Sequence, residues 1–231
     1  MSESLNIADV FFAAIGRGDS AAVEALLLQQ PGLIDTRNVQ NVGAVLWALY
    51  HERAELAQSL AARRGRLDLA EQVALGHEAE AREEFARDPV LLQGYSDDGF
   101  TLLGLAVFFR QGALACWMIA QGAAVNAAAT NAMRVAPIHA AVARSDGETL
   151  LALLLAGADP DLAQTQGIRP LHDAALGGKH AMAGLLLLHG ARVDLRDARG
   201  RTAAMMAEEA GHAMLARCLR RFEGGFSLKN A

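Results

Sequence analysis

The chain has 231 residues, of which 52% are hydrophobic and only 5% aromatic, and its formal net charge at pH 7 is −5. This acidic balance argues against a nucleic-acid-binding protein, because such domains carry a basic face or stripe. The longest apolar stretch, residues 150–158, is about half the length of a membrane-spanning helix. Residues 1–12 lack the basic and then apolar pattern of a secretory signal. We therefore expect a cytoplasmic protein that binds neither nucleic acid nor membrane.

Residues 6–38 predict two short helices separated by a turn at Gly18. The same pattern returns at residues 67–96, because segments 10–35 and 68–93 align at an offset of 58 that pairs Gly18 with Gly76 and Pro31 with Pro89. The string GRGDSA at 16–21 resembles a dinucleotide-binding loop, but such a loop follows a β-strand and this string follows a predicted helix. We interpret it as a turn between helices.

Residues 41–66 and 98–130 form a second matching pair of segments, which align at an offset of 57. In each, an apolar residue precedes a glycine by 20 positions, Val45 before Gly65 and Leu102 before Gly122. Trp47 stands where the later segments have a histidine. The first half of the chain therefore looks like a duplicated unit of two helix pairs.

Residues 133–163, 166–198 and 199–222 complete the series, now with a clear period of 33 between Gly167 and Gly200. Proline opens the first helix in two of these segments, where its fixed φ suits a helix and its missing N–H is not needed. Gly178 and Gly211 fall between the paired helices, where glycine accepts a left-handed backbone at least cost. A helix-turn-helix period of this length indicates stacked repeats that bury their apolar faces only against neighbours.

The blocks RPLHDAAL at 169–176, GADPD at 157–161 and GARVD at 190–194 resemble the T-P-L-H-x-A-A and G-A-D-x-N blocks of the ankyrin family. The sequence looks most like the bacterial ankyrin proteins that alternate orthodox repeats with "ALG…ARDP" repeats, as at 74–89. The resemblance covers nearly the whole chain and implies an all-α ankyrin-repeat solenoid with β-turn fingers. It predicts one domain over residues 1–222 and a tail over 223–231. The seven expected repeats, including degenerate caps, span 6–38, 41–66, 67–96, 98–130, 133–163, 166–198 and 199–222.

Motifs for catalysis or metal binding are weak. Gly178-Lys179 lacks the upstream glycine and the following Ser or Thr of a phosphate-binding loop. His139 and His172 stand 33 residues apart at equivalent positions, so we interpret them as structural histidines rather than zinc ligands. Cys116 and Cys218 have no metal-ligand spacing, and we expect buried free thiols. We predict no catalytic residue, no metal, no cofactor and no enzymatic activity.

Partner binding is expected on the concave face of the first helices and on the finger tips, as the resemblance implies. Phe108 and Phe109 fill a pair of positions that varies between repeats, and they either anchor a partner or pack against the next repeat. Successive fingers carry Arg134, Arg169 and Arg199. This row favours an acidic or carboxylate-bearing partner, unless it is only a solvated edge. The candidates are Trp47, His51, Leu105, Phe108, Phe109, Arg144 and Asp173 on helices, and Tyr95, Phe100, Arg134, Arg169 and Arg199 on fingers.

The sequence therefore predicts a monomeric, non-catalytic protein-protein interaction module that works as a scaffold, adaptor or inhibitor. The alternative is an enzyme or small-ligand receptor that uses the concave groove near Trp47, Tyr50 and His51. A deep pocket with converging polar groups would favour this alternative.

Overall fold

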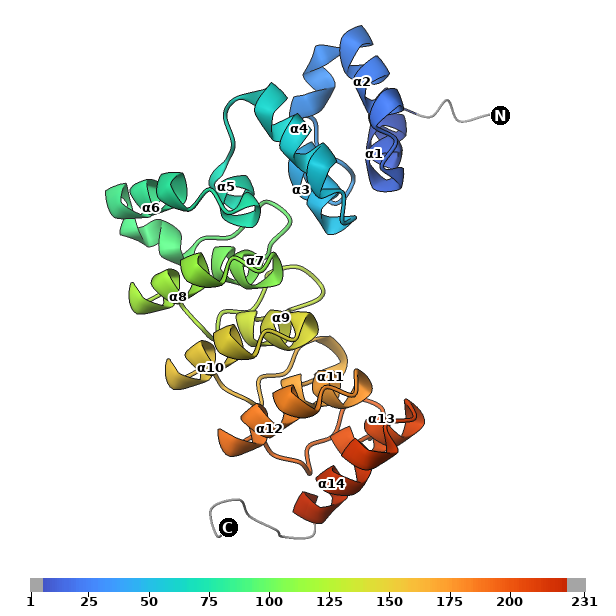
Figure 1. Ribbon diagram of the computed structural model, residues 1–231, viewed down its shortest axis with the longest axis vertical. Helices are drawn as coiled ribbons and strands as arrows, with labels where there is room; N and C mark the ends of the chain where they lie inside the picture. Colours follow the sequence, from blue (N-terminus) through green and yellow to red (C-terminus); the bar gives the residue numbers. More distant parts are fainter. Residues whose placement is uncertain (1–5, 224–231) are drawn as a thin grey trace. The chain divides into compact units, whose positions relative to one another are not determined.

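The computed structural model describes residues 6–223, and it folds them into short helices joined by tight turns (Figure 1). Within these residues there is no β-strand, only two isolated antiparallel bridges, Arg37 with Gly43 and Tyr95 with Thr101. The all-α prediction is confirmed. No helix of the described part is long and apolar enough to cross a membrane. The helices group into two compact units.

The N-terminal unit comprises Met1–Arg87 together with Ser96–Asp98. Helix α1 packs against α2 and α3, and α3 packs against α4 and α5. Phe11, Ile15, Leu27 and Leu60 are among its largest fully buried side chains. Its helices are α1 (Ile7–Arg17), α2 (Ser20–Gln29), the 3-10 helix η1 (Pro31–Asp35), α3 (Ala44–Tyr50), α4 (Ala54–Arg64), α5 (Leu69–Leu75) and α6 (Glu78–Arg87).

The C-terminal unit comprises Asp88–Tyr95 together with Gly99–Ala231. First helices α7, α9, α11 and α13 form one row, and second helices α8, α10 and α12 form another beside it (Figure 1). Its helices are η2 (Pro89–Gln93), α7 (Leu102–Phe108), α8 (Gly112–Ala120), α9 (Pro137–Arg144), α10 (Gly147–Leu155), η3 (Thr165–Gly167), α11 (Pro170–Leu176), α12 (His180–Leu188), α13 (Ala203–Glu209) and α14 (Ala213–Glu223). The last helix ends at Glu223, and the rest of the predicted tail lies outside the described residues.

Each turn between paired helices contains one residue with a left-handed backbone. Gly178 has φ +63° and Gly211 has φ +83°, as predicted for these two glycines. The conformation is not reserved for glycine, because three of the equivalent residues carry side chains. Along residues 6–223 these turn residues are Gly18, Glu52, Gly76, Arg110, Ser145, Gly178 and Gly211.

The fingers of the C-terminal unit are joined to one another by backbone hydrogen bonds. Thr130 N–H donates to Gly99 O over 2.9 Å, Thr165 N–H to Met133 O over 3.2 Å, and Ala198 N–H to Gln166 O over 2.8 Å. Each finger therefore gives one donor to the finger before it. This satisfies polar groups that extended loops would otherwise leave unpaired, and it holds the finger tips in a row.

The duplication in the first half of the chain is closer than the sequence comparison indicated. Residues 20–29, 31–35 and 44–50 form α2, η1 and α3, and the second copy places α6, η2 and α7 at the same residues plus 58. The two β-bridges obey the same offset. The sequence comparison predicted an offset of 57 between residues 41–66 and 98–130. This is wrong for the first helices of these segments, because α3 and α7 are 58 residues apart. The registers part only in the second helix, because α4 has 11 residues and α8 has nine.

This register moves two candidate residues. Trp47 corresponds to Leu105 rather than to the histidine position, and His51 corresponds to Phe109 as the residue that ends the first helix. The dihedral angles agree, with φ −94° and ψ 13° at His51 and φ −87° and ψ 13° at Phe109. The sequence alignment was one residue out of register in the first helix, because α4 is longer than α8.

The burial expected for the cysteines is also wrong. Cys116 on α8 is half-buried and Cys218 on α14 is exposed, and both thiols are free. Cys218 lies on the last described helix, where no further repeat among the described residues packs over it.

Candidate partner-binding surface

In the C-terminal unit, the first helix of each repeat ends on a pair of residues just before the left-handed turn. Because these helices pack side by side, their ends form a continuous strip that we call the pair surface. Its character changes along the chain from aromatic to cationic, then aliphatic, then acidic. The pairs are Phe108–Phe109, Ala143–Arg144, Leu176–Gly177 and Glu209–Ala210.

Phe108, Phe109 and Arg144 form the centre of this surface. The two rings meet edge to face, with centroids 5.2 Å apart and an interplanar angle of 87°. The Arg144 guanidinium carbon lies over the Phe108 ring, 5.2 Å from its centroid. All three residues are half-buried, so the phenylalanines are neither fully packed nor fully exposed. The cation–π contact fixes a charged group and an aromatic ring in one place.

Cationic side chains from both neighbours cap the C-terminal end of α9. Arg110 Nη2 donates to Arg144 O over 2.8 Å, and Lys179 Nζ donates to Val142 O over 2.8 Å and to Ala143 O over 2.6 Å. The last carbonyls of a helix have no partner within it and carry partial negative charge, so cations there are favourable. Desolvation by burial lowers the pKa of Lys179, and Asp173 raises it.

Asp173, on α11, supplies the acidic group next to this cluster. Its Oδ2 accepts a hydrogen bond from Gln164 Nε2 over 2.9 Å. Burial raises the pKa of Asp173 to about 6, although Lys179 acts in the opposite direction. The carboxyl group is therefore easier to neutralise than an exposed aspartate, and the surroundings of Arg144 are correspondingly more positive.

Leu105 is a correction to the predicted surface. Its side chain is only 2% exposed, because α7 packs directly against α9. Leu105 therefore belongs to the apolar interior of the unit and is not available to a partner.

Trp47 and His51 serve the interior of the N-terminal unit. Trp47 Nε1 donates to Phe12 O over 2.9 Å, and its ring packs edge to face on Phe12. His51 Nδ1 lies 3.0 Å from Trp47 O, and its ring centroid is 4.2 Å from that of Trp47. Both side chains are half-buried and join α1 to α3, so their contacts are accounted for by packing.

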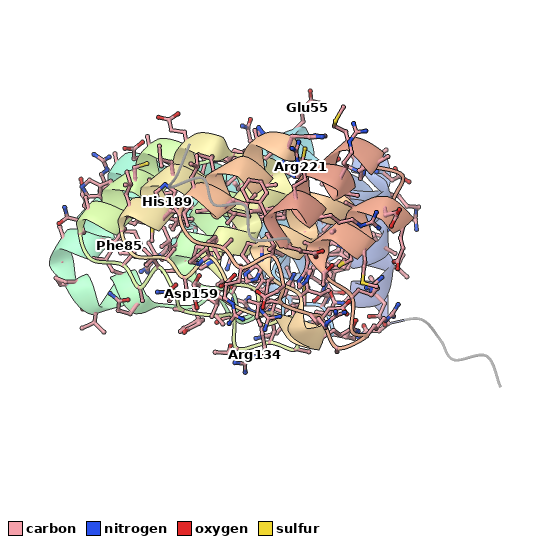
Figure 2. All side chains as sticks on the ribbon, turned by 90° about the horizontal axis from the view of Figure 1, so that it is seen from below. Glu55, Phe85, Arg134, Asp159, His189 and Arg221 are labelled. Atoms are coloured by element: carbon pink, nitrogen blue, oxygen red, sulfur yellow. The ribbon has the colours of Figure 1, made fainter. Side chains whose placement is uncertain are left out.

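The finger residues divide into exposed and engaged side chains. Tyr95 is 43% exposed, Phe100 is half-buried, and Arg134 and Arg199 are exposed. Figure 2 shows Arg134 on the finger side, with its side chain pointing away from the helices. Arg169 is different and corrects the predicted arginine row. It is half-buried, and its Nη1 donates to Gly167 O over 3.0 Å and to Arg196 O over 2.9 Å, which clamps two successive fingers.

The histidines at the third position of α9 and α11 bind the backbone. Nδ1 of His172 accepts the Arg169 N–H over 3.1 Å, and its Nε2 lies 3.1 Å from Leu195 O in the next finger. Nδ1 of His139 accepts the Ala136 N–H over 3.2 Å. Burial lowers the pKa of both, that of His139 to about 4. These contacts support the structural interpretation.

Glu71 was missed by the sequence analysis, although it occupies the same third position in α5. Its Oε2 accepts the Asp68 N–H over 3.0 Å, while Oε1 pairs with Arg64 Nη1. The side chain is 1% exposed, and burial raises its pKa while Arg64 lowers it. Asp68 accepts from the Glu71 N–H over 2.9 Å in return. The acidic pair spaced by three residues before an apolar run is the signal that predicts this capping box.

A surface hollow of about 400 Å³ lies elsewhere, between α2 and α4 of the N-terminal unit. Its lining combines apolar side chains with the Glu24–Arg63 ion pair, whose atoms are 2.5 Å apart. It does not include the three residues that the small-ligand alternative singled out. Of these, the Tyr50 hydroxyl donates to Asp98 Oδ2 over 2.8 Å, so Tyr50 joins Trp47 and His51 in contacts within the unit.

Comparisons with known proteins identify the repeats. A family model described as ankyrin repeats in three copies matches residues 138–225. Human cyclin-dependent kinase inhibitor 2A is 49% identical over 76 residues, which is 32% of this chain and 47% of that protein. Bovine cyclin-dependent kinase 4 inhibitor B is 48% identical over 75 residues, or 31% and 56% of the two chains. The potassium channel AKT1 of indica rice is 42% identical over 72 residues, or 31% and 8%.

The chain therefore spans about half the length of the two kinase inhibitors it matches, and a small part of the channel. The family match shows that residues 138–225 are ankyrin repeats, and helix pairs of the same kind recur through the rest of the described residues.

Proposed function

We propose that the protein is a non-catalytic interaction module, a scaffold, adaptor or inhibitor, that binds a protein partner through the pair surface and adjacent finger tips. The Phe108–Arg144 contact is the observation that carries this proposal. Aromatic and arginine side chains dominate the binding energy of protein interfaces. Because the ring and the guanidinium already hold each other, less side-chain entropy is lost when a partner arrives.

The rest of the pair surface fits the same purpose. Leu176 is 52% exposed beside this centre, and Arg134 and Arg199 are exposed on the fingers of the same unit. The backbone bonds between fingers keep the tips in register. An interface needs an apolar centre with a polar rim, and these residues supply both within one compact unit.

The names of the relatives suggest which partner to test first. Two of them are named as inhibitors of cyclin-dependent kinases, so we propose a protein kinase as the first partner class and inhibition as the first effect. A third relative is named as a potassium channel, so the repeats alone do not select the partner. A cyclin-dependent kinase assay with added chain tests this class. Unchanged kinase activity would rule out this partner class without contradicting the proposal that the protein is an interaction module.

The experiment for the module is affinity purification from the native cell with three forms of the full chain. Phe108→Ala removes the ring under Arg144, and we expect a specific partner to be lost or bound about tenfold more weakly. Leu155→Ala is the matched control, because Leu155 is 73% exposed on α10, away from the pair surface. A folded Phe108→Ala variant that retains every partner would contradict the proposal.

A further inference from the structure

We infer that the pair surface recognises an acidic segment of its partner, with a partner carboxylate bound by Arg144 beside an apolar side chain placed on the phenylalanine pair. This inference rests on the proposed function and specifies the chemistry of its partner. The chain as a whole is acidic, with a net charge of −5, yet Arg110, Arg144 and Lys179 gather around the C-terminal end of α9.

These three cations differ in how they are used. Arg110 and Lys179 donate to the terminal carbonyls of α9 and are held by them. Of the side chains that the structure describes, the Phe108 ring is the one that holds the Arg144 guanidinium. Within residues 6–223 its guanidinium makes no ion pair, and its buried Nε has no hydrogen-bond partner. The structure thus positions a guanidinium without supplying the anion that such a group ordinarily binds.

The carboxylates near Arg144 do not fill this role. Asp146 caps α10, where its Oδ1 accepts the Thr149 N–H over 3.1 Å and its Oδ2 accepts the Thr149 hydroxyl over 2.7 Å. Asp173 is occupied by Gln164 Nε2. Glu148 lies in the first turn of α10, where the positive end of the helix favours it. Among the described residues, the carboxylates near Arg144 are thus used elsewhere, and we infer that its anion comes from another molecule.

The geometry favours a carboxylate. A guanidinium presents parallel N–H donors that match the two oxygens of a carboxylate. Phe108 covers one side of the group, which leaves the Nη donors at its edge for an incoming acid. Phosphorylated segments are recognised by clusters of arginines, but here the neighbouring Arg110 is already committed to a backbone carbonyl. The two rings next to Arg144 provide the apolar contact that would make the acidic segment specific.

The test uses the immobilised full chain and a random-peptide display library. Peptides selected on the wild type should be enriched in Asp or Glu next to an aromatic or aliphatic residue. A synthetic peptide with the selected sequence should bind Arg144→Gln at least about tenfold more weakly than the wild type. The same peptide with its Glu replaced by Gln should lose affinity for the wild type. Arg144→Lys keeps the positive charge but loses the parallel N–H donors of the guanidinium, so its affinity for the peptide should lie between those of the wild type and Arg144→Gln. Arg192→Gln is the control, because Arg192 forms an exposed pair with Asp194 on a different loop.

Failure to enrich any peptide, enrichment without acidic residues, or equal affinity for wild type and Arg144→Gln would each overturn the inference. So would a phosphoserine version of the peptide that binds about tenfold more tightly than the acidic one, since it would assign the surface to phosphorylated partners. If a cellular partner is lost with Phe108→Ala but kept by Arg144→Gln, the acidic specificity fails while the proposed function stands.

Discussion

The third residue of the first helix shows how single side chains adapt one repeat to different sequences. His139 and His172 accept the backbone N–H of the residue that precedes the helix, and Glu71 does the same with a carboxylate. Where the third residue cannot accept, a threonine before the helix does so instead: Thr101 accepts the Gly104 N–H over 2.9 Å. In each of these repeats a side chain accepts a free backbone N–H at the N-terminus of the first helix. The residue that supplies this acceptor differs from repeat to repeat.

Buried His139 should make stability depend on pH. Because its Nδ1 accepts an N–H, the neutral ring carries its proton on Nε2. Burial lowers its pKa from 6.5 to about 4, so the unfolded chain binds more protons than the folded one between these values. The contribution of His139 to the free energy of unfolding is complete above pH 6.5 and is lost as pH falls toward 4. Nitrogen-15 NMR should find the ring neutral at the middle of this window.

Asp173 acts in the opposite direction, because its raised pKa of about 6 makes its stabilising contribution present below 3.8 and lost as pH rises through 6. The two effects are separated by His139→Gln, in which an amide can accept and donate as the imidazole does. Urea unfolding across the pH window should show a smaller loss at low pH for this variant than for the wild type. Identical pH profiles would show that His139 does not titrate as described.

At the scale of the element, the turn between paired helices is fixed by one left-handed residue and its surroundings. Glu52, Arg110 and Ser145 occupy it with φ between +54° and +62°, so a side chain alone does not forbid the turn. Gly178 has an added constraint. A Cβ built there would lie 2.6 Å from the ring of His212, which reaches to 3.1 Å from Leu176 O at the end of α11.

Gly178→Ala should therefore destabilise the protein by roughly 1–3 kcal/mol, from left-handed strain and displacement of the His212 ring. Gly184→Ala is the matched control within the same repeat. Gly184 lies inside α12, and a Cβ there meets nothing within 4 Å, so the change should stabilise by up to about 1 kcal/mol. Urea unfolding midpoints measure both. Equal effects of the two substitutions would mean that the turn geometry is not limiting.

At the scale of the whole molecule, stability in each unit comes from helices that contact the next helices in the series. In the C-terminal unit α7 contacts α9, α9 contacts α11, α11 contacts α13, and α13 contacts α14. Such a stack behaves as a sum of neighbour interfaces. The prediction that residues 1–222 form one domain remains a prediction, since the helices group into two compact units.

A destabilising substitution in the last repeat should therefore affect the neighbouring helices most and the more distant helices less. Leu219 on α14 is 1% exposed, and Leu219→Ala should cost about 2–5 kcal/mol locally by leaving a cavity. Hydrogen exchange should show the greatest loss of protection in α14 and α13, a smaller loss in α11, and none in α1 and α3 of the other unit. A uniform loss in all helices would instead indicate a single cooperative structure.

The sequence alone determined the repeats, their period and the glycine turns, because these depend on local backbone preferences and on the spacing of apolar residues. It also placed Phe108 and Phe109 at the end of a first helix. It misplaced Trp47 and His51 by one residue, because the longer α4 moved the spacing on which the alignment relied. Even where the periodicity is strong, the alignment of two repeats can be wrong by one residue if the defining proline and histidine are absent.

Only the tertiary structure decided which of these side chains a partner can reach. Leu105 is buried because α9 packs against it, and Arg169 is engaged because the next finger brings a carbonyl to its guanidinium. Arg144 meets Phe108 across a helix–helix contact, where each residue belongs to a different repeat. Exposure and pairing in a stacked fold are set by the neighbouring repeat, so a pattern read within one repeat cannot supply them.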